Sequence, residues 1–195
     1  MKYIAIFCGT AIGNKPVFSQ QADLLGSKLV EYGYGIVYGG AGVGLMGVVA
    51  DSVLKAGGEV IGVIPQFLKR KELEHNKITK TYVVDTMDAR KRLMNELCSG
   101  VITLPGGFGT MDEYFEMLTL GQLALHKKPV ALLNTDGYYN PLLIQVENMI
   151  ENGFLKEEYR ELLLVDSDVD RLLDSMNTYA APKNEKWFEP QMINR

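Results

Sequence analysis

Short apolar runs alternate along the chain with longer segments whose apolar residues recur at helical spacing. The runs are rich in Val and Ile without polar alternation, which is typical of parallel strands covered on both faces. The pattern predicts strands near residues 3–8, 35–38, 59–64, 80–84, 101–104 and 130–133, and a weaker one near 162–165. It predicts helices near 16–32, 44–56, 89–98, 110–126, 141–152 and 169–177. The sequence therefore predicts an α/β fold: a doubly wound, mostly parallel sheet with helices on both faces.

Length and composition fit one domain with a substantial core. The chain has 195 residues, of which 47% are hydrophobic, and this composition argues against disorder. It contains no internal repeat or linker. We expect a single domain over residues 1–181 and a C-terminal tail over 182–195 that is either loose or docked on a neighbour.

Charge and residue usage exclude several classes of protein. A net charge of −4 does not favour nucleic acid or an anionic membrane as the main partner, and no apolar run approaches the length of a membrane span. The first eight residues resemble a strand rather than the core of a signal peptide. Cys8 and Cys98 lie in apolar surroundings, which predicts reduced, buried thiols in a cytoplasmic protein. His75 and His126 are isolated from other ligand types, so we expect no metal site.

A glycine-rich turn directly follows the fifth predicted strand and precedes a helical pattern. Gly106, Gly107 and Gly109 would let the backbone approach an anion without a Cβ in the way. The free N–H groups and the positive end of the helix dipole would favour a phosphate there. Thr110 can cap the helix or bind phosphate, and Glu113 fits the capping-box position three residues later. A well-capped helix after a tight turn is the structural alternative.

Two more glycine-rich loops follow predicted strands. The first contains Gly9 and Thr10, and the second contains Gly40 and a G-x-G-x-x-G match that ends at Gly47. A dinucleotide fingerprint normally follows the first strand, and the acidic residue that should bind the ribose is missing after the next strand. Tight helix packing is the alternative role of this second loop. All three loops would lie at the carboxyl ends of parallel strands, which together indicates a phosphorylated, nucleotide-like ligand.

Three adjacent cations lie near the start of the third predicted helix, at Arg90, Lys91 and Arg92. Positive charge is unfavourable at this end of a helix, so the group requires an anion partner. Met87 shares a helix face with Arg90. A guanidinium binds phosphate or carboxylate through two parallel hydrogen bonds, so a substrate phosphate and Glu113 are both candidate partners. A solvated basic helix start is the alternative.

Two motifs in this order resemble the Lonely guy (LOG) family of cytokinin-activating enzymes, long labelled possible lysine decarboxylases. They are Met87-x-x-Arg90-Lys91-x-x-Met94 and Pro105-Gly106-Gly107-x-Gly109-Thr110-x-x-Glu113. The resemblance extends over roughly residues 4–155. It implies a Rossmann-like fold, usually a homodimer, and a phosphoribohydrolase without cofactor. Such an enzyme cleaves the N-glycosidic bond of a purine nucleoside 5′-monophosphate and releases the free base and ribose 5-phosphate.

The resemblance also implies roles for individual residues. The 5′-phosphate would be held by Gly106, Gly107, Gly109 and Thr110, and the catalytic pair would be Arg90 and Glu113. We further expect substrate contacts from Met87, Lys91, Gly9, Thr10 and Gly40. A carboxylate at Glu113 would stabilise the oxocarbenium-like charge on the ribose or activate water. The chain departs from the family pattern at Thr10-Ala11, Ala41, Leu120 and Ala124, which leaves cytokinin-type and AMP-like bases open.

Two other functions remain as alternatives. A non-catalytic carrier of a nucleotide or of molybdenum cofactor would share this fold, but it has no need of a carboxylate beside the sugar, so Arg90 and Glu113 favour the enzyme. A decarboxylase would require pyridoxal phosphate on a lysine. Nothing in the sequence singles out Lys91, Lys127 or Lys128 for such a Schiff base.

Overall fold

The computed structural model describes residues 2–69 and 74–182, and its strands form one sheet of seven. The strand order is β4-β3-β2-β1-β5-β6-β7, and every neighbouring pair is parallel. The strands are β1 Lys2–Phe7, β2 Tyr34–Tyr38, β3 Val60–Pro65, β4 Lys80–Val84, β5 Cys98–Thr103, β6 Val130–Leu133 and β7 Leu163–Asp166. This confirms the predicted α/β class and the parallel sheet.

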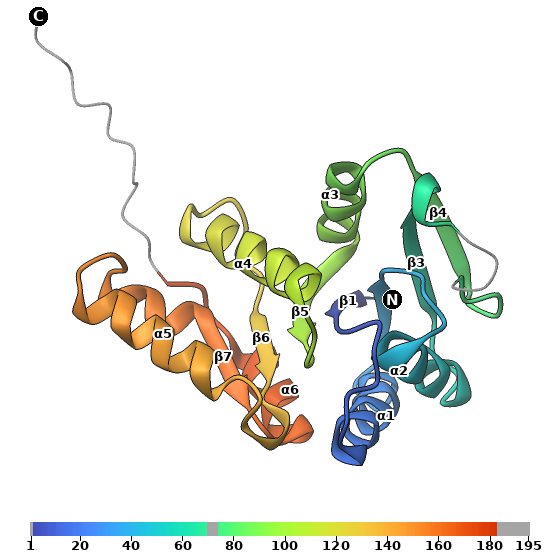
Figure 1. Cartoon of the computed structure of the whole chain (residues 1–195), viewed down its shortest axis with the longest axis horizontal. Coiled ribbons are helices and arrows are strands. Elements are labelled where there is room, and N and C mark those ends of the chain that lie inside the picture. The colour runs from blue at the N-terminus through green and yellow to red at the C-terminus, as the bar shows by residue number, and fades with distance from the viewer. Residues whose placement is uncertain (1, 70–73, 183–195) are drawn as a thin grey trace, which may run out of the picture.

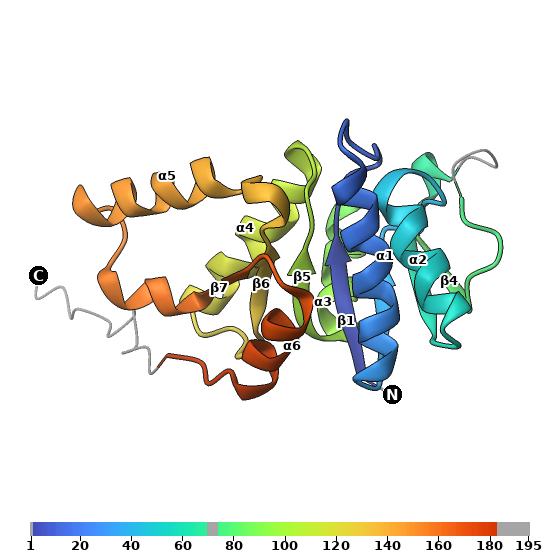
Figure 2. The ribbon, with the colours of Figure 1, turned by 90° about the horizontal axis from the view of Figure 1, so that it is seen from below.

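Helices cover both faces of the sheet, as predicted (Figure 1). On one face lie α1 Pro16–Glu31, α2 Gly44–Lys55 and α6 Val169–Thr178, which Figure 2 shows on the near side. On the other lie α3 Met87–Leu97, α4 Phe108–Gln122 and α5 Asn140–Glu151. Short 3-10 turns occupy Gln66–Leu68, Thr135–Gly137 and Glu157–Leu162. Among the described helices, none combines the length and apolar character that a membrane crossing requires.

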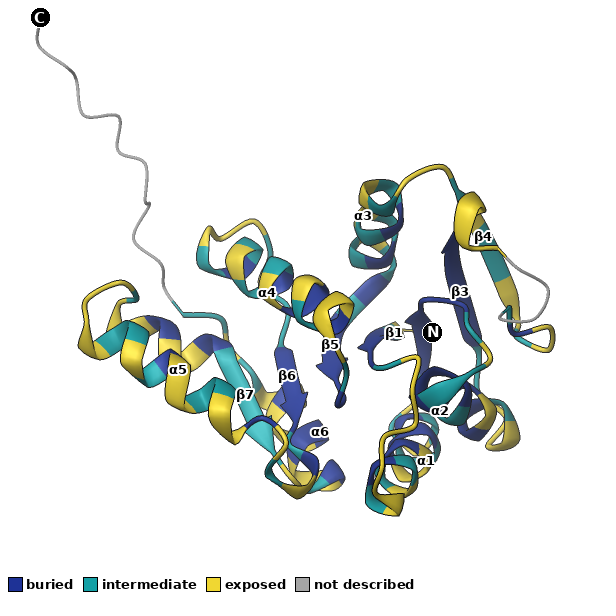
Figure 3. Ribbon diagram, in the orientation of Figure 1, coloured by how far each residue is buried: buried dark blue, intermediate teal, exposed yellow. Residues whose placement is uncertain are grey.

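The strands contribute alternate side chains to two separate apolar layers. In β2, Ile36 and Tyr38 pack beneath α1 and α2, whereas Val37 packs beneath α3. Both layers exclude water, so the central strands are buried except near their starts, as at Lys2 and Tyr34, while the outer helix surfaces are exposed (Figure 3). Burial on both faces explains why these strands lack polar alternation in the sequence.

The boundary between α3 and β5 differs from the prediction. The helix begins at Met87, two residues early, because Thr86 Oγ1 accepts the N–H of Ala89 at 3.1 Å and caps it. It ends at Leu97. Cys98, which we expected in the helix, instead opens β5 and pairs with Tyr3 of β1.

The predicted bounds of α4 were also wrong at both ends. The helix begins at Phe108 with Gly107 as its N-cap, so Thr110 lies inside the first turn and does not cap it. The predicted capping box is therefore absent at this described helix start. The helix ends at Gln122 because Ala124 takes a left-handed conformation with φ of 56°, and the Leu125 N–H returns to the Leu120 carbonyl at 2.9 Å.

The strand order reverses at the centre of the sheet. The chain leaves β1 toward β2 on one side, while β5 pairs with β1 on the other side. The loops after β1 and β5 therefore lie side by side at the carboxyl edge, where residues of both line a cavity. Open α/β sheets bind ligands at such a switch point.

Candidate functional site

The three glycine-rich loops meet at the carboxyl edge of the sheet. The Gly9 N–H, just after β1, donates to the Pro105 carbonyl, just after β5, at 3.0 Å. The Leu45 N–H, at the start of α2, donates to the Ala11 carbonyl at 3.4 Å. The loop after β1 is thus hydrogen-bonded to both of the others, and the predicted convergence is confirmed.

Some of the glycines are required by this packing. A Cβ on Gly106 would lie 2.1 Å from Thr110 Oγ1 and 2.9 Å from the Gly9 nitrogen. A Cβ on Gly44 would lie 2.2 Å from the Thr10 carbonyl carbon, and Gly44 also has φ of +61°. A side chain would force its neighbours to shift at both positions: the Thr110 side chain and the Gly9 backbone at Gly106, and the Thr10 backbone at Gly44.

Gly107 and Gly109 are not explained by packing. A Cβ at either position would meet no atom of the described residues within 4 Å, and neither residue has a left-handed φ. Gly107 is the N-cap of α4 and Gly109 lies in its first turn, where the first backbone N–H groups have no partner within the helix. Their missing side chains therefore leave open space beside unpaired donors, which suits an anionic ligand.

A cavity of about 420 Å³ opens beside these loops. It is lined by residues 9–14 after β1, by residues 105–107 after β5, and by three larger side chains, Phe18, Leu45 and Tyr138. Its volume falls in the range typical of small-molecule sites. The predicted contact residues Gly9, Thr10, Gly106 and Gly107 all line it.

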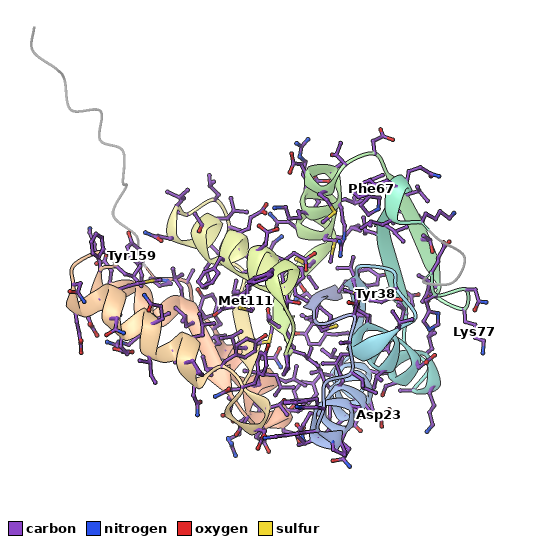
Figure 4. The ribbon with its side chains drawn as sticks, viewed as in Figure 1. Asp23, Tyr38, Phe67, Lys77, Met111 and Tyr159 are labelled. Atoms are coloured by element: carbon purple, nitrogen blue, oxygen red, sulfur yellow. The ribbon has the colours of Figure 1, made fainter. Side chains whose placement is uncertain are left out.

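Arg90 and Glu113 form a buried ion pair between α3 and α4. Arg90 Nη2 lies 3.1 Å from Glu113 Oε1, and the two side chains are only 9% and 6% exposed. The structure thereby identifies the carboxylate partner that the sequence left open for Arg90. Figure 4 shows the side chains of these elements and labels Met111, in the first turns of α4, and Tyr38, at the end of β2. Neither member of the pair lines the cavity, so the ion pair and the cavity are separate parts of the site.

The second glycine loop makes room for the guanidinium group. A Cβ on Gly39, directly after β2, would lie 2.4 Å from Arg90 Nη2. Gly39 does not have a left-handed φ, so this close approach is what its missing side chain permits. Gly40, which we predicted to contact the substrate, follows it with φ of +82°.

Burial and charge act in opposite directions on Glu113. Burial raises the pKa of Glu113 above that of an ordinary glutamate, while the positive charge of Arg90 lowers it. Arg90 Nη1 also approaches Met87 Sδ at 3.8 Å, and its buried Nε has no hydrogen-bond partner among the described residues. The guanidinium therefore holds the carboxylate and keeps one donor unused.

Cys8, directly after β1, lies within range of the Glu113 charge. Burial raises the pKa of the Cys8 thiol strongly, and the negative charge of Glu113 raises it further. Both Cys8 and Cys98 are free and buried, as predicted. A thiol with a raised pKa is a poor nucleophile, so Cys8 contributes packing rather than chemistry.

Lys91 takes part in a second link between α3 and α4. Its ammonium group contacts the Glu116 carboxylate and lies 3.3 Å from Asp112 Oδ2. Hydrogen bonding to Glu116 is the main cause that raises the pKa of Lys91, so the group stays protonated. The structure thus places Lys91 in contact with α4, and it does not line the cavity.

Both histidines connect segments of backbone rather than forming a centre for chemistry. His75 Nδ1 accepts the Lys77 N–H at 3.2 Å, so Nε2 carries the proton and donates to Asp51 Oδ1 at 3.1 Å. The backbone N–H of His75 donates to the Gly40 carbonyl at 3.0 Å and so fixes the glycine-rich loop after β2. Within residues 2–69 and 74–182, no three His, Cys, Asp or Glu side chains lie close enough together to hold a metal ion.

His126 and Lys128 hold the end of α4 and the start of β6 in the same way. His126 Nδ1 accepts the Lys128 N–H at 3.1 Å, and Nε2 donates to the Met117 carbonyl at 2.9 Å. Lys128 Nζ donates to Asn95 Oδ1 at 2.7 Å. The sequence pattern around His126 gave no hint of these bonds, because their partners lie on other elements.

Comparison with known proteins identifies relatives over most of the chain. A family model described as "Possible lysine decarboxylase" matches residues 46–176. A probable cytokinin riboside 5′-monophosphate phosphoribohydrolase of Oryza sativa subsp. japonica is 42% identical over 182 residues, which are 93% of this chain and 82% of the relative. A cytokinin riboside 5′-monophosphate phosphoribohydrolase of Arabidopsis thaliana is 39% identical over 178 residues, or 91% and 82% of the two chains.

Solved structures share the fold at lower identity. The molybdenum cofactor binding protein of Rippkaea orientalis has a TM-score of 0.68 at 22% identity, over 90% of this chain and 95% of that one. The molybdenum cofactor carrier protein of Chlamydomonas reinhardtii has a TM-score of 0.65 at 22% identity, over 89% and 98% of the two chains. These two likenesses establish the architecture alone. The sequence relatives and the family model together show that the chain belongs to the Lonely guy (LOG) family.

Proposed function

We propose that this protein hydrolyses the N-glycosidic bond of purine nucleoside 5′-monophosphates and releases the free base and ribose 5-phosphate. The observation that carries the proposal is the buried Arg90–Glu113 pair next to an open, glycine-lined helix N-terminus. The names of the plant relatives, which are cytokinin riboside 5′-monophosphate phosphoribohydrolases, support the same reaction.

The phosphate of the substrate binds at the N-terminus of α4. Gly107 and Gly109 leave the space, the first-turn N–H groups supply donors, and the helix dipole favours the negative charge. Thr110 adds a hydroxyl at the base of the turn, and this hydroxyl occupies the space that a side chain on Gly106 would need. Gly9 and Thr10 border the same cavity from the β1 side.

The ribose lies between this phosphate site and the ion pair. Cleavage of the glycosidic bond develops positive charge on the sugar ring, which an ionised carboxylate at Glu113 stabilises. The same carboxylate accepts a proton from the attacking water. Arg90 opposes the effect of burial on the pKa of Glu113 and orients the carboxylate, since its Nη2 is only 3.1 Å from Oε1. The positive charge of Arg90 offsets negative charge that develops on the departing base.

The lysine decarboxylase activity named in the description of the family model, which would require pyridoxal phosphate on a lysine, has less support. A Schiff base requires a neutral lysine, and such lysines have lowered pKa values. Contact with Glu116 instead raises the pKa of Lys91. Lys128 donates to Asn95 and holds α3 in place.

We further propose a cytoplasmic homodimer with a single domain over residues 1–181, with AMP-like nucleotides among its substrates and without a metal or cofactor. The tail over 182–195 lies, apart from residue 182, outside the described residues. Exposed apolar side chains at both ends of α4 support an interface there: Phe108 is 98% exposed and Leu125 is 69% exposed. Met117, in the same helix, is buried in the core.

The test is base release from three substrates, measured by chromatography of the purified protein's products. AMP and isopentenyladenosine monophosphate should each yield free base and ribose 5-phosphate in equal amounts, and the faster of the two sets the side-chain preference. Adenosine should react far more slowly, because it lacks the phosphate that the α4 site binds. Equal rates with adenosine would contradict the phosphate assignment, and no release from either monophosphate would contradict the reaction.

A further inference from the structure

Two consecutive tyrosines bind the backbone of the glycine-rich turn from the loop after β6. The Tyr138 hydroxyl donates to the Gly106 carbonyl at 2.7 Å, and the Tyr139 hydroxyl donates to the Leu104 carbonyl at 2.6 Å. The two bonds reach carbonyls on either side of Pro105. They join β6 and β5 at the edge of the proposed phosphate site.

The Tyr138 ring is 44% exposed and packs against two other aromatic rings. It packs edge-on against Phe18, with ring centroids 6.0 Å apart, and edge-on against Tyr139 at 4.9 Å. The same ring lines the cavity. Just before it, Asp136 has a φ of 54°, and its carboxylate pairs with Lys15 at the start of α1. The hydroxyl of Tyr138 is therefore preorganised to meet the turn.

The two hydroxyl bonds differ in what they fix. In a trans peptide the carbonyl and the following N–H point in opposite directions, so a bond to one sets the direction of the other. The Gly106 carbonyl shares its peptide with the Gly107 N–H, whereas the Leu104 carbonyl shares its peptide with Pro105, which has no N–H. A peptide between two glycines also rotates with little steric hindrance, so it requires an external restraint to hold one orientation.

We propose that Tyr138 is a positioning residue for phosphate binding: its hydroxyl fixes the Gly106–Gly107 peptide and so presents the Gly107 N–H to the substrate's 5′-phosphate. The inference rests on the phosphate site of the proposed function. Tyr139 makes a bond of similar length to the same turn, 2.6 Å against 2.7 Å, but controls no donor. It therefore serves as a matched control.

The experiment compares Tyr138→Phe with Tyr139→Phe, since both changes keep the ring and remove one hydroxyl. Calorimetry with ribose 5-phosphate measures the phosphate site without requiring turnover. Tyr138→Phe should weaken binding by about five- to tenfold, the effect of one net hydrogen bond, and should raise KM for AMP by a similar factor with kcat within about twofold. Tyr139→Phe should leave the affinity for ribose 5-phosphate and KM for AMP within about twofold of the unmodified protein. It should lower the melting temperature instead.

Equal affinities for ribose 5-phosphate in all three proteins would overturn the role of Tyr138. Equal weakening in both variants would overturn it as well, since a general loosening of the turn would then explain the result. An unmodified protein that fails to bind ribose 5-phosphate would contradict the phosphate site itself. Because binding is measured directly, a protein that binds this ligand but releases no base would contradict only the proposed reaction.

Discussion

The contact between Gly39 and the ion pair predicts how a single methyl group would affect catalysis. In Gly39→Ala the new Cβ would lie 2.4 Å from Arg90 Nη2, whereas ordinary van der Waals contact begins at 3.4 Å. The guanidinium must therefore move by roughly 1 Å, and a misplacement of that size in a catalytic group costs about 10²-fold in rate. The clashing atoms are at the end of a flexible side chain and the φ of Gly39 suits alanine, so the fold should tolerate the change.

The assay is kcat for base release from AMP, with the melting temperature measured in parallel. Gly58→Ala is the control, because its Cβ would lie 2.5 Å from Val30 Cγ2 and 2.8 Å from Val53 Cγ1, near the start of β3 and remote from the ion pair. The control should lose about 1–3 kcal/mol of stability through overpacking while kcat stays unchanged. Gly39→Ala should show the reverse pattern.

A double variant tests whether the loss acts through the carboxylate. In a Glu113→Gln background, Gly39→Ala should cause little further loss, because residues that act as a unit are not additive. A Gly39→Ala protein with unchanged kcat would refute the reasoning, and so would one whose activity loss simply follows its loss of stability.

Three other measurements follow from the site and its surroundings. Burial raises the pKa of Glu113, and the ionised carboxylate is the active form, so the loss of kcat/KM on acidification should begin at a higher pH than for an enzyme with an exposed catalytic glutamate. In Arg90→Met, which removes the charge that lowers this pKa, the loss should begin at a still higher pH. A pH profile that lacks either feature would contradict the assignment. Gly106→Ala should raise the dissociation constant for ribose 5-phosphate by at least about tenfold, because the new Cβ would displace the Thr110 hydroxyl and the turn; calorimetry with unchanged affinity would count against the site. Lys128→Met should lower the free energy of unfolding by about 1.5–3 kcal/mol, since its ammonium group holds the end of α3, while KM for AMP stays constant; denaturant titration checks this.

The sheet was predictable because its signals are local. Buried runs such as Val130–Leu133 are apolar on both faces, and only a strand covered by two helix layers requires that. Glycine spacing also predicted that three loops converge at the carboxyl edge, since turns after parallel strands all lie at one edge. The ion pair was partly predictable, because Arg90 at a helix start needs an anion and Glu113 was one of two candidates.

Helix boundaries depended on interactions that a local pattern does not contain. The end of α4 is set by the left-handed Ala124, a residue type that seldom adopts this conformation, and its start is set by Gly107 rather than by the better capping residue Thr110. The hydroxyl bond from Tyr138 to Gly106 joins residues 32 positions apart. Contacts of that kind arise from the assembled sheet and leave no periodic signal in the sequence.

The most direct test of the account is the rate of base release by Glu113→Gln, with Asp112→Asn as the matched control on the adjacent residue. Asp112 is largely exposed and lies near Lys91, whereas Glu113 is buried against Arg90. The account predicts that Glu113→Gln loses base release by about 10²-fold or more while it still binds ribose 5-phosphate, and that Asp112→Asn stays near the unmodified rate. Base release at an undiminished rate by Glu113→Gln would contradict the assignment of Glu113 as the catalytic carboxylate.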